Sequence, residues 1–243
     1  MPSSLLVLAA LMGTALALPS PITAADPVRI LPYNWLFNIT ALKGPGCPDF
    51  GQVSPPFSTR PTFGMNTVDG SEIYYWHFAY PHIRLSVGPE TPEASVWCET
   101  TLSYAELENS DGLVPAVEPE YRLKLHKNGT RMLANYELDE GVEARWKFTY
   151  ATNGHDKIVD NITVAGPREA GSYSDNSPQR ELVQWRLPKC GTGTIKYRTE
   201  LTLKASKAGA KGSVSSEKTQ WEGETGFYGV QQGVSYDWEK CAA

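Results

Sequence analysis

The sequence predicts an all-β protein, an antiparallel β-sandwich of the jelly-roll or Greek-key kind stapled by disulfides. Short stretches in which apolar and polar side chains alternate recur along the chain, which is typical of such sandwiches. The chain has 21 Gly and 18 Pro residues, and no helix-period segment extends beyond two turns. With 243 residues and 41% hydrophobic content, it is long enough to bury a sizeable core.

The most regular alternation lies between Pro119 and Tyr150 and predicts three consecutive antiparallel strands. Asn128-Gly129 is the dipeptide that favours a type I′ hairpin turn, and Asp139–Gly141 fits a three-residue hairpin loop. In this register Trp146 lies opposite Ala134 on the apolar face of one sheet. We therefore expect a meander with a buried face.

The remaining strands are expected from shorter alternating runs. These are Trp35–Leu42, Ile73–Tyr80, Ile83–Val87, Val96–Leu107, Lys157–Val164, Leu182–Leu187, Gly193–Ala205 and Val234–Lys240. Ile73–Tyr80 is aromatic on both faces, which favours a buried central strand over a binding platform. Irregular connections are expected over Gly44–Gly70, Gly166–Pro178 and Ser206–Ser216, which are rich in Gly, Pro or small polar residues.

The first 17 residues have the pattern of a signal peptide. Leu5–Leu18 is apolar, uncharged and too short to span a bilayer, and Ala15-Leu16-Ala17 supplies the small residues of a cleavage site. Residues 18–34 are rich in Pro and small side chains and are expected to form a loosely held arm before a single β-sandwich domain over 35–243. We expect a secreted, extracellular protein with no membrane partner.

Four cysteines follow the predicted cleavage site: Cys47, Cys98, Cys190 and Cys241. In an oxidising compartment an even number indicates two disulfides, with three possible pairings. None has the spacing of a metal site, and we expect no cofactor. Sequons at Asn38, Asn128 and Asn161 are candidate glycosylation sites.

The charge pattern argues against nucleic acid as a partner. The net charge is −5, both signs are interspersed, and there is no basic stripe. We expect a monomer.

Few residue patterns indicate catalysis. The chain lacks a Gly-x-Ser-x-Gly elbow. His77 and His82 could form a metal pair, although a hydrogen-bonded histidine at a strand end is the preferred interpretation. In the meander register Glu137 and Glu143 are cross-strand neighbours, either a carboxylate pair for glycoside hydrolysis or, as we prefer, two solvated side chains.

Aromatic side chains are the better candidates for binding, because flat rings stack on sugar faces. Trp146 and Trp185 lie on the apolar phase of their strands and are expected in the core. Trp97 is out of phase with its apolar neighbours, and Trp221 lies in a polar, Gly-rich stretch. Trp97 and Trp221 are therefore the candidate binding surface.

Several short motifs follow one another in a fixed order along the chain. They are Gly46-Cys47-Pro48, Val87-Gly88-Pro89 before Cys98, Leu138-Asp139-Glu140-Gly141-Val142, Gly166-Pro167, Trp185 before Cys190-Gly191, and Trp238-Glu239-Lys240-Cys241. This series resembles the domain of unknown function 4360 family of small secreted fungal proteins. The resemblance covers about Leu42–Cys241. It implies a secreted β domain with Cys47 bonded to Cys98 and Cys190 to Cys241, and it implies no activity.

Three functions stay open on the sequence alone. The first is a secreted, non-catalytic β-sandwich that binds cell-wall glycan or a host surface. The second is a secreted hydrolase that acts on polysaccharide through paired carboxylates. The third is a purely structural extracellular protein.

Overall fold

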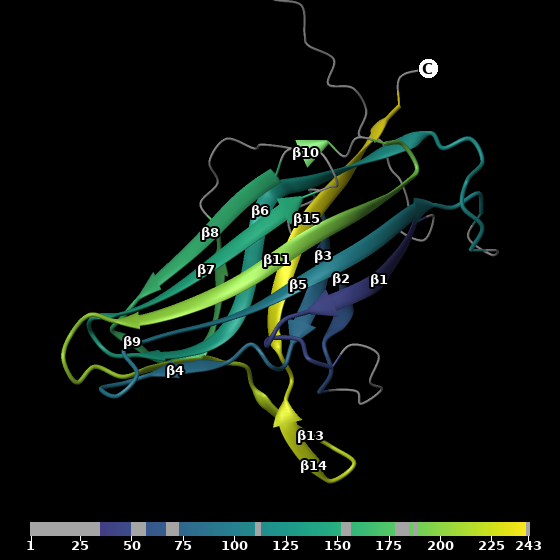
Figure 1. Ribbon diagram of the computed structural model, residues 1–243. Coiled ribbons are helices and arrows are strands. Elements are labelled where there is room, and N and C mark those ends of the chain that lie inside the picture. Colours follow the sequence, from purple (N-terminus) through teal and green to yellow (C-terminus); the bar gives the residue numbers. More distant parts are fainter. Residues whose placement is uncertain are drawn as a thin grey trace, which may run out of the picture.

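The computed structural model describes residues 35–49, 57–66, 73–109, 113–151, 157–177, 185–186 and 189–241. The predicted signal peptide (1–17) and arm (18–34) lie outside these ranges. The described chain forms two antiparallel sheets and a separate hairpin, as Figure 1 shows. The prediction of an all-β, disulfide-stapled sandwich is confirmed.

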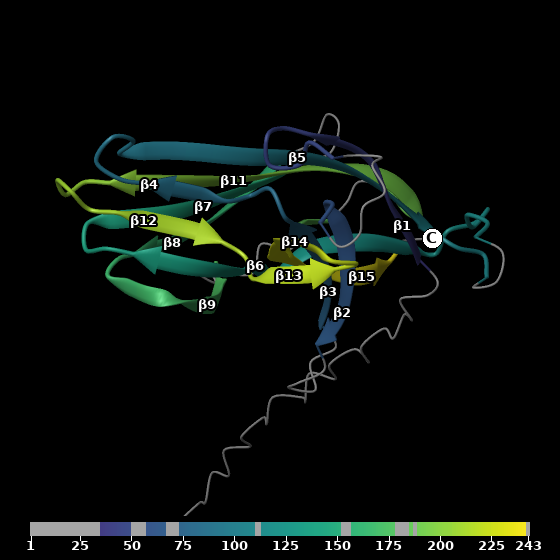
Figure 2. The same ribbon diagram turned by 90° about the horizontal axis from the view of Figure 1, so that it is seen from below.

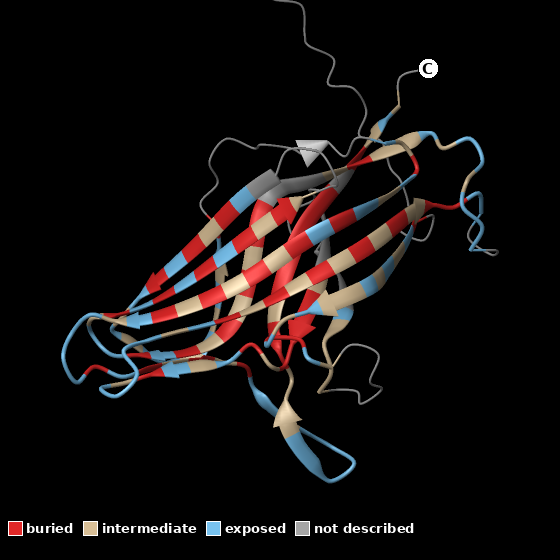
Figure 3. Ribbon diagram, in the orientation of Figure 1, coloured by how far each residue is buried: buried red, intermediate tan, exposed pale blue. Residues whose placement is uncertain are grey.

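The first sheet has five strands, which Figure 2 shows on edge together with the second sheet. In spatial order they are β1 (Trp35–Lys43), β5 (Glu93–Glu106), β11 (Thr192–Ala205), β7 (Val142–Ala151) and β8 (Lys157–Ala165). Buried and accessible residues alternate along β5, β7 and β11, as the stripes in Figure 3 show. This period of two directs every second side chain to the core.

The second sheet has eight strands. Six follow one path: β2 (Arg60–Asn66), β3 (Ile73–Tyr80), β15 (Val230–Lys240), β6 (Tyr121–Leu138), β12 (Gly212–Ser215) and β4 (Leu85–Val87). The other two, β9 (Arg168–Asn176) and β10 (Trp185–Arg186), pair with β6. A hairpin of β13 (Lys218–Trp221) and β14 (Glu224–Phe227) projects from one end of the sandwich in Figure 1.

The predicted hairpin at Asn128-Gly129 is wrong, because residues 121–138 form the single long strand β6. The neighbouring strand β15 pairs with both halves of β6: Leu125 lies opposite Tyr236, and Thr130 lies opposite Val234. The intervening four residues of β6 therefore bulge against Ser235 alone. Gly129 has a φ of 73°, a value that a bulge and a type I′ turn can both require.

The predicted second hairpin is also not a hairpin within one sheet. The Asp139–Gly141 loop carries the chain from β6 in one sheet to β7 in the other. Trp146 is paired with Leu201 of β11 and Ile162 of β8, rather than with Ala134. The residues of β6 and β7 that face the core were predicted correctly. The two strands lie in different sheets, however, so their apolar faces pack against each other across the core and the strands are not hydrogen-bonded neighbours.

Three predicted connections contain strands. Gly44–Gly70 holds β2, Gly166–Pro178 holds β9, and Ser206–Ser216 holds β12. β2 is an edge strand, where Pro61 is tolerated because its missing N–H need not join a ladder. β9 is polar and has no alternation of its own, so it depends on β6 as its template.

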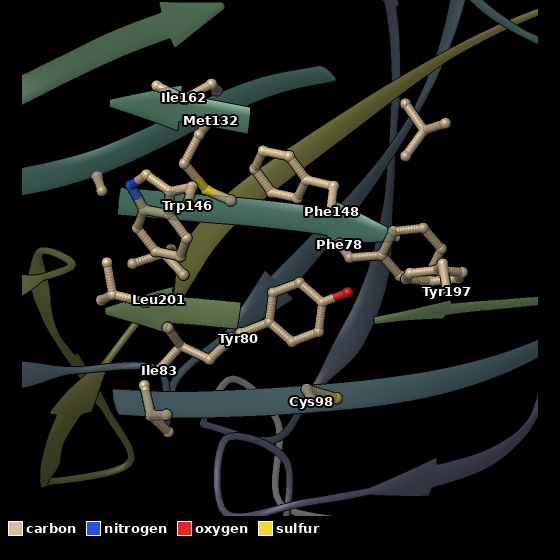
Figure 4. Close-up of a cluster of buried hydrophobic side chains, with 14 of the residues drawn as sticks. Phe78, Tyr80, Ile83, Cys98, Met132, Trp146, Phe148, Ile162, Tyr197 and Leu201 are labelled. Atoms are coloured by element: carbon tan, nitrogen blue, oxygen red, sulfur yellow. The ribbon is translucent and has the colours of Figure 1, made fainter. Parts of the chain in front are cut away.

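The core is aromatic and lies between the sheets. Figure 4 shows Trp146 and Phe148 of β7 among Phe78 and Tyr80 of β3 and Met132 of β6. All five side chains are at most 2% exposed. Cys47 is bonded to Cys98 and Cys190 to Cys241, which is the pairing that the family resemblance implied.

Within the described ranges, the structure contains no helical segment with the length and apolarity needed to cross a bilayer.

Candidate functional site

A pocket of about 440 Å³ lies where three segments that are distant in sequence converge. Its lining is Phe57, Pro81, His82, Arg84, Lys218, Thr225, Gly226 and Phe227. These come from the segment before β2, the turn between β3 and β4, and the β13–β14 hairpin. Concave sites with aromatic walls and a few polar groups are the usual form of small-molecule sites.

The hairpin owes its shape to the Glu222-Gly223 turn. Glu222 has a φ of 49° and Gly223 a φ of 86°, and Trp221 is paired with Glu224 across them. Positive φ at both central residues is the signature of a type I′ turn. Asn-Gly, the dipeptide that signals a type I′ turn in the sequence, is thus not the one used in this hairpin, whose turn residues are Glu222 and Gly223.

A hydrogen bond closes the base of the hairpin, and two ring contacts hold it against neighbouring segments. The Tyr228 N–H donates to the Glu217 carbonyl (3.0 Å), and the Arg60 guanidinium lies 4.5 Å from the centroid of the Tyr228 ring. The Phe57 ring packs so closely on Gly226 that a Cβ there would lie 2.4 Å from a ring carbon. Gly226 is therefore required for this wall of the pocket.

The polar side of the pocket comes from the Pro81–Arg84 turn. Pro81 follows the last residue of β3, and the Ile83 N–H donates to the Tyr80 carbonyl (3.3 Å). His82 Nε2 lies 3.5 Å from Asp49 Oδ2, and the Asp49 carboxylate accepts hydrogen bonds from Thr59 N (2.7 Å) and Thr59 Oγ1 (3.0 Å). Asp49 thus orients His82 and anchors the segment that carries Phe57.

Phe227 is the central wall of the pocket. The Arg84 guanidinium carbon lies 4.6 Å from its ring centroid, and Lys218 Nζ lies 5.9 Å from it. Both distances fall within the range of cation–π attraction. The ring therefore holds two exposed cationic groups at the pocket.

The two predicted surface tryptophans lie elsewhere, although Trp221 is on the pocket's hairpin. Trp221 is 52% exposed beside the turn. Trp97 in β5 is half-buried: the Arg198 guanidinium covers one face at 4.1 Å, and a Cβ at Gly44 would lie 2.6 Å from its ring. Trp97 therefore packs the Cys47 loop onto the sheet and leaves little free ring face.

The other residues singled out in the sequence are dispersed. Asn38 is exposed on β1, Asn161 is partly exposed on β8, and the side chain of Asn128 lies outside the described part of the structure. The side chain of Trp185 also lies outside it, whereas Trp146 is in the core.

Glu137 and Glu143 belong to different sheets, so the predicted cross-strand pair is wrong.

Among the side chains that the structure describes, the two buried carboxylates, Glu106 and Asp160, accept hydrogen bonds from backbone N–H groups. Glu106 Oε2 accepts from Tyr121 N (3.0 Å), and Asp160 accepts from Thr130 N (3.1 Å) and Asn161 N (3.0 Å). Burial raises the pKa of Glu106. These bonds satisfy N–H groups that would otherwise be costly to bury.

His77 and His82, the histidines considered as a metal pair, lie in β3 and in the turn that follows it. His77 lies in β3 with its pKa lowered by burial and by the positive charge of Arg131, whereas His82 lies in the pocket. No group of three or more His, Cys, Asp or Glu side chains that could hold a metal ion is found in the described ranges.

Sequence reasoning missed Phe57, Arg84, Lys218 and Phe227. They lie in loops or in strands too short for alternation to be informative. Glu222-Gly223 between two short polar runs was the one local signal of the hairpin.

Comparisons with known proteins give distant structural likenesses. No family model matches the chain, and no curated protein matches it. Among solved structures, the carbohydrate-binding module TmCBM61 in complex with β-1,4-galactotriose is similar, with 10% identity over 76% of this chain and 90% of that chain and a TM-score of 0.23. A family 11 carbohydrate-binding module from Clostridium thermocellum in complex with a β-1,3-1,4-mixed-linked tetrasaccharide has 9% identity over 86% and 92% of the two chains and a TM-score of 0.19.

The enzymatically active domain of tailspike protein 4 of bacteriophage CBA120 has 11% identity over 75% of this chain and 19% of that chain, with a TM-score of 0.19. With TM-scores this low, none of these likenesses identifies a ligand or a site for this chain.

Proposed function

We propose that this is a secreted, non-catalytic protein that binds an extracellular glycan in the pocket beside the β13–β14 hairpin. The observation that carries the proposal is the combination of Phe57 and Phe227 with His82, Arg84 and Lys218 around one cavity. Aromatic rings can stack on the apolar face of a pyranose. The three polar side chains can donate hydrogen bonds to its hydroxyl and ring oxygens.

The proposed extracellular location is supported by the two disulfides, which persist in oxidising compartments. The predicted signal peptide is consistent with it. Membership of the domain of unknown function 4360 family is part of the same proposal and assigns no activity.

A panel of cell-wall oligosaccharides tests binding, first on an array and then by isothermal titration calorimetry with each glycan that binds. Phe57→Ala is expected to weaken binding at least about tenfold, the loss typical of a truncated aromatic anchor. Val117→Ala is the matched control, because Val117 is 83% exposed and does not line the pocket. Circular dichroism and denaturant melts of both variants show whether the fold is retained.

Two results would contradict the proposal. Glycan binding that Phe57→Ala leaves unchanged and Trp97→Phe weakens would move the site to the outer face of the five-stranded sheet. Release of reducing sugars that persists through purification and is lost on substitution of a single acidic residue would replace binding by hydrolysis.

A further inference from the structure

The pocket is positively charged, whereas the whole chain has a net charge of −5. Arg84 and Lys218 are exposed and both lie over Phe227. Cation–π attraction uses the face of a guanidinium group and leaves its N–H edge available for a ligand. The structure thus holds two cationic groups at the ring without consuming their hydrogen-bond donors.

The carboxylates near the pocket do not neutralise these cations. Within the described residues, neither Arg84 nor Lys218 forms an ion pair with an acidic side chain. Asp49 is next to His82, has a side chain only 10% exposed and already accepts two hydrogen bonds from Thr59.

The acidic side chains on and beside the hairpin, Glu217, Glu222 and Glu224, are not among the residues that line the pocket. The positive charge of the pocket is therefore left for a ligand to neutralise.

We infer that the glycan bound in this pocket carries an anionic group, a carboxylate or a sulfate ester, which Arg84 and Lys218 bind while a phenyl ring packs against the sugar. This inference rests on the proposed function and specifies its ligand. An anion between the two cations gains charge-assisted hydrogen bonds from both and relieves their mutual repulsion. A neutral sugar gains only the stacking and neutral hydrogen bonds.

Matched pairs of soluble probes separate the two sources of charge. Oligogalacturonate is compared with its methyl ester, and dextran sulfate oligomers are compared with dextran oligomers of equal length. We expect at least one acidic member to bind about tenfold or more tightly than its neutral counterpart. Its affinity should fall as NaCl is raised from about 0.05 to 0.5 M, because salt screens exposed charges.

Variants locate the charge effect. Arg84→Met and Lys218→Met are each expected to weaken binding of the acidic probe roughly 10- to 100-fold, the effect of losing a hydrogen bond to a charged group. Lys218→Arg should retain most of the affinity. Lys207→Met is the matched control: it removes the same charge from a side chain that is 60% exposed and pairs with Glu140 away from the pocket.

The outcomes separate this inference from the proposed function. Equal binding of acidic and neutral probes, with Lys218→Met unchanged but Phe57→Ala weakened, would overturn the anionic ligand and leave glycan binding in place. Equal losses in Lys218→Met and Lys207→Met would show non-specific charge attraction and also overturn it. Failure of the wild-type protein to bind any glycan of the panel or of the matched pairs would overturn both proposals.

Discussion

Removal of the Trp146 side chain is the most direct test of how the two sheets face each other. Trp146 is fully buried, its ring stacks on Phe148 with centroids 6.5 Å apart, and its Nε1–H donates to the Tyr136 hydroxyl at 2.8 Å. Tyr136 lies in β6 and Trp146 in β7, so this hydrogen bond joins the sheets across the core. Trp146 is 0% exposed, compared with 3% for Trp238 and 5% for Trp35.

The expected cost of Trp146→Ala is about 3–5 kcal/mol, the range for deleting a buried large aromatic side chain. The upper part of that range is expected, because the buried Tyr136 hydroxyl also loses its donor. Trp146→Phe keeps most of the apolar volume and should cost about 1–3 kcal/mol, mainly through the lost hydrogen bond. Tyr136→Phe should cost a similar amount, because it orphans the indole N–H.

Urea unfolding of the four proteins in the Trp146→Phe/Tyr136→Phe cycle measures the hydrogen bond itself. The double variant is expected to lose less than the sum of the single variants, with a coupling of about 1 kcal/mol. A cost below about 1 kcal/mol for Trp146→Ala would show that the ring is not in the core. A coupling near zero would refute the contact between the sheets.

Three further predictions concern the pH dependence, the bulge and the disulfides. Burial raises the pKa of Tyr80 to about 12, whereas a tyrosine of the unfolded chain ionises near pH 10, so stability should fall as pH rises from about 10 to 12. Tyr80→Phe should make this fall in the denaturant midpoint less steep, while the other buried tyrosines with raised pKa values still contribute to it. Gly129→Ala should lower the stability measured in urea melts more than Gly223→Ala does. Both glycines have a positive φ, but an added Cβ would lie 2.3 Å from Ser177 Oγ at position 129 and would meet nothing within 4 Å at position 223. Equal costs would contradict the bulge geometry. Non-reduced peptide mapping should yield the Cys47–Cys98 and Cys190–Cys241 peptides, and loss of either bond should cost about 4 kcal/mol in the chain-entropy model; a Cys47–Cys190 peptide would refute the pairing.

Prediction from sequence succeeded where the signal is local. The alternation at the end of Pro119–Tyr150 and in Gly193–Ala205 identified β7 and β11 and the side chains that face the core, because the period of a strand is set by its own backbone. It failed for β9 and β12, whose polar or small residues have no such period. Those segments become strands only because β6 offers unpaired backbone groups to them.

The candidate site was harder to predict for a different reason. Its residues belong to segments as far apart as Phe57 and Phe227, and none of these segments has a chemical motif of its own. Trp221 was singled out for its polar surroundings and proved to lie on the hairpin that forms one wall of the pocket. The sequence does not show that Arg84 and Lys218 lie near each other, because only the fold places both of them over the Phe227 ring.

The sequence by itself determined the all-β class, the apolar phase of the long strands and the presence of a residue with positive φ at Gly129. Only the tertiary structure decided whether that glycine reverses the chain or forms a bulge. Both conformations satisfy the local backbone. The choice depends on β15, a strand a hundred residues later that runs past Gly129 and pairs with β6 on both sides of it. Backbone N–H and C=O groups are the same in nearly every residue, so they do not specify which strands pair. The packing of the whole core decides the strand partners, and with them the pocket that their connections enclose.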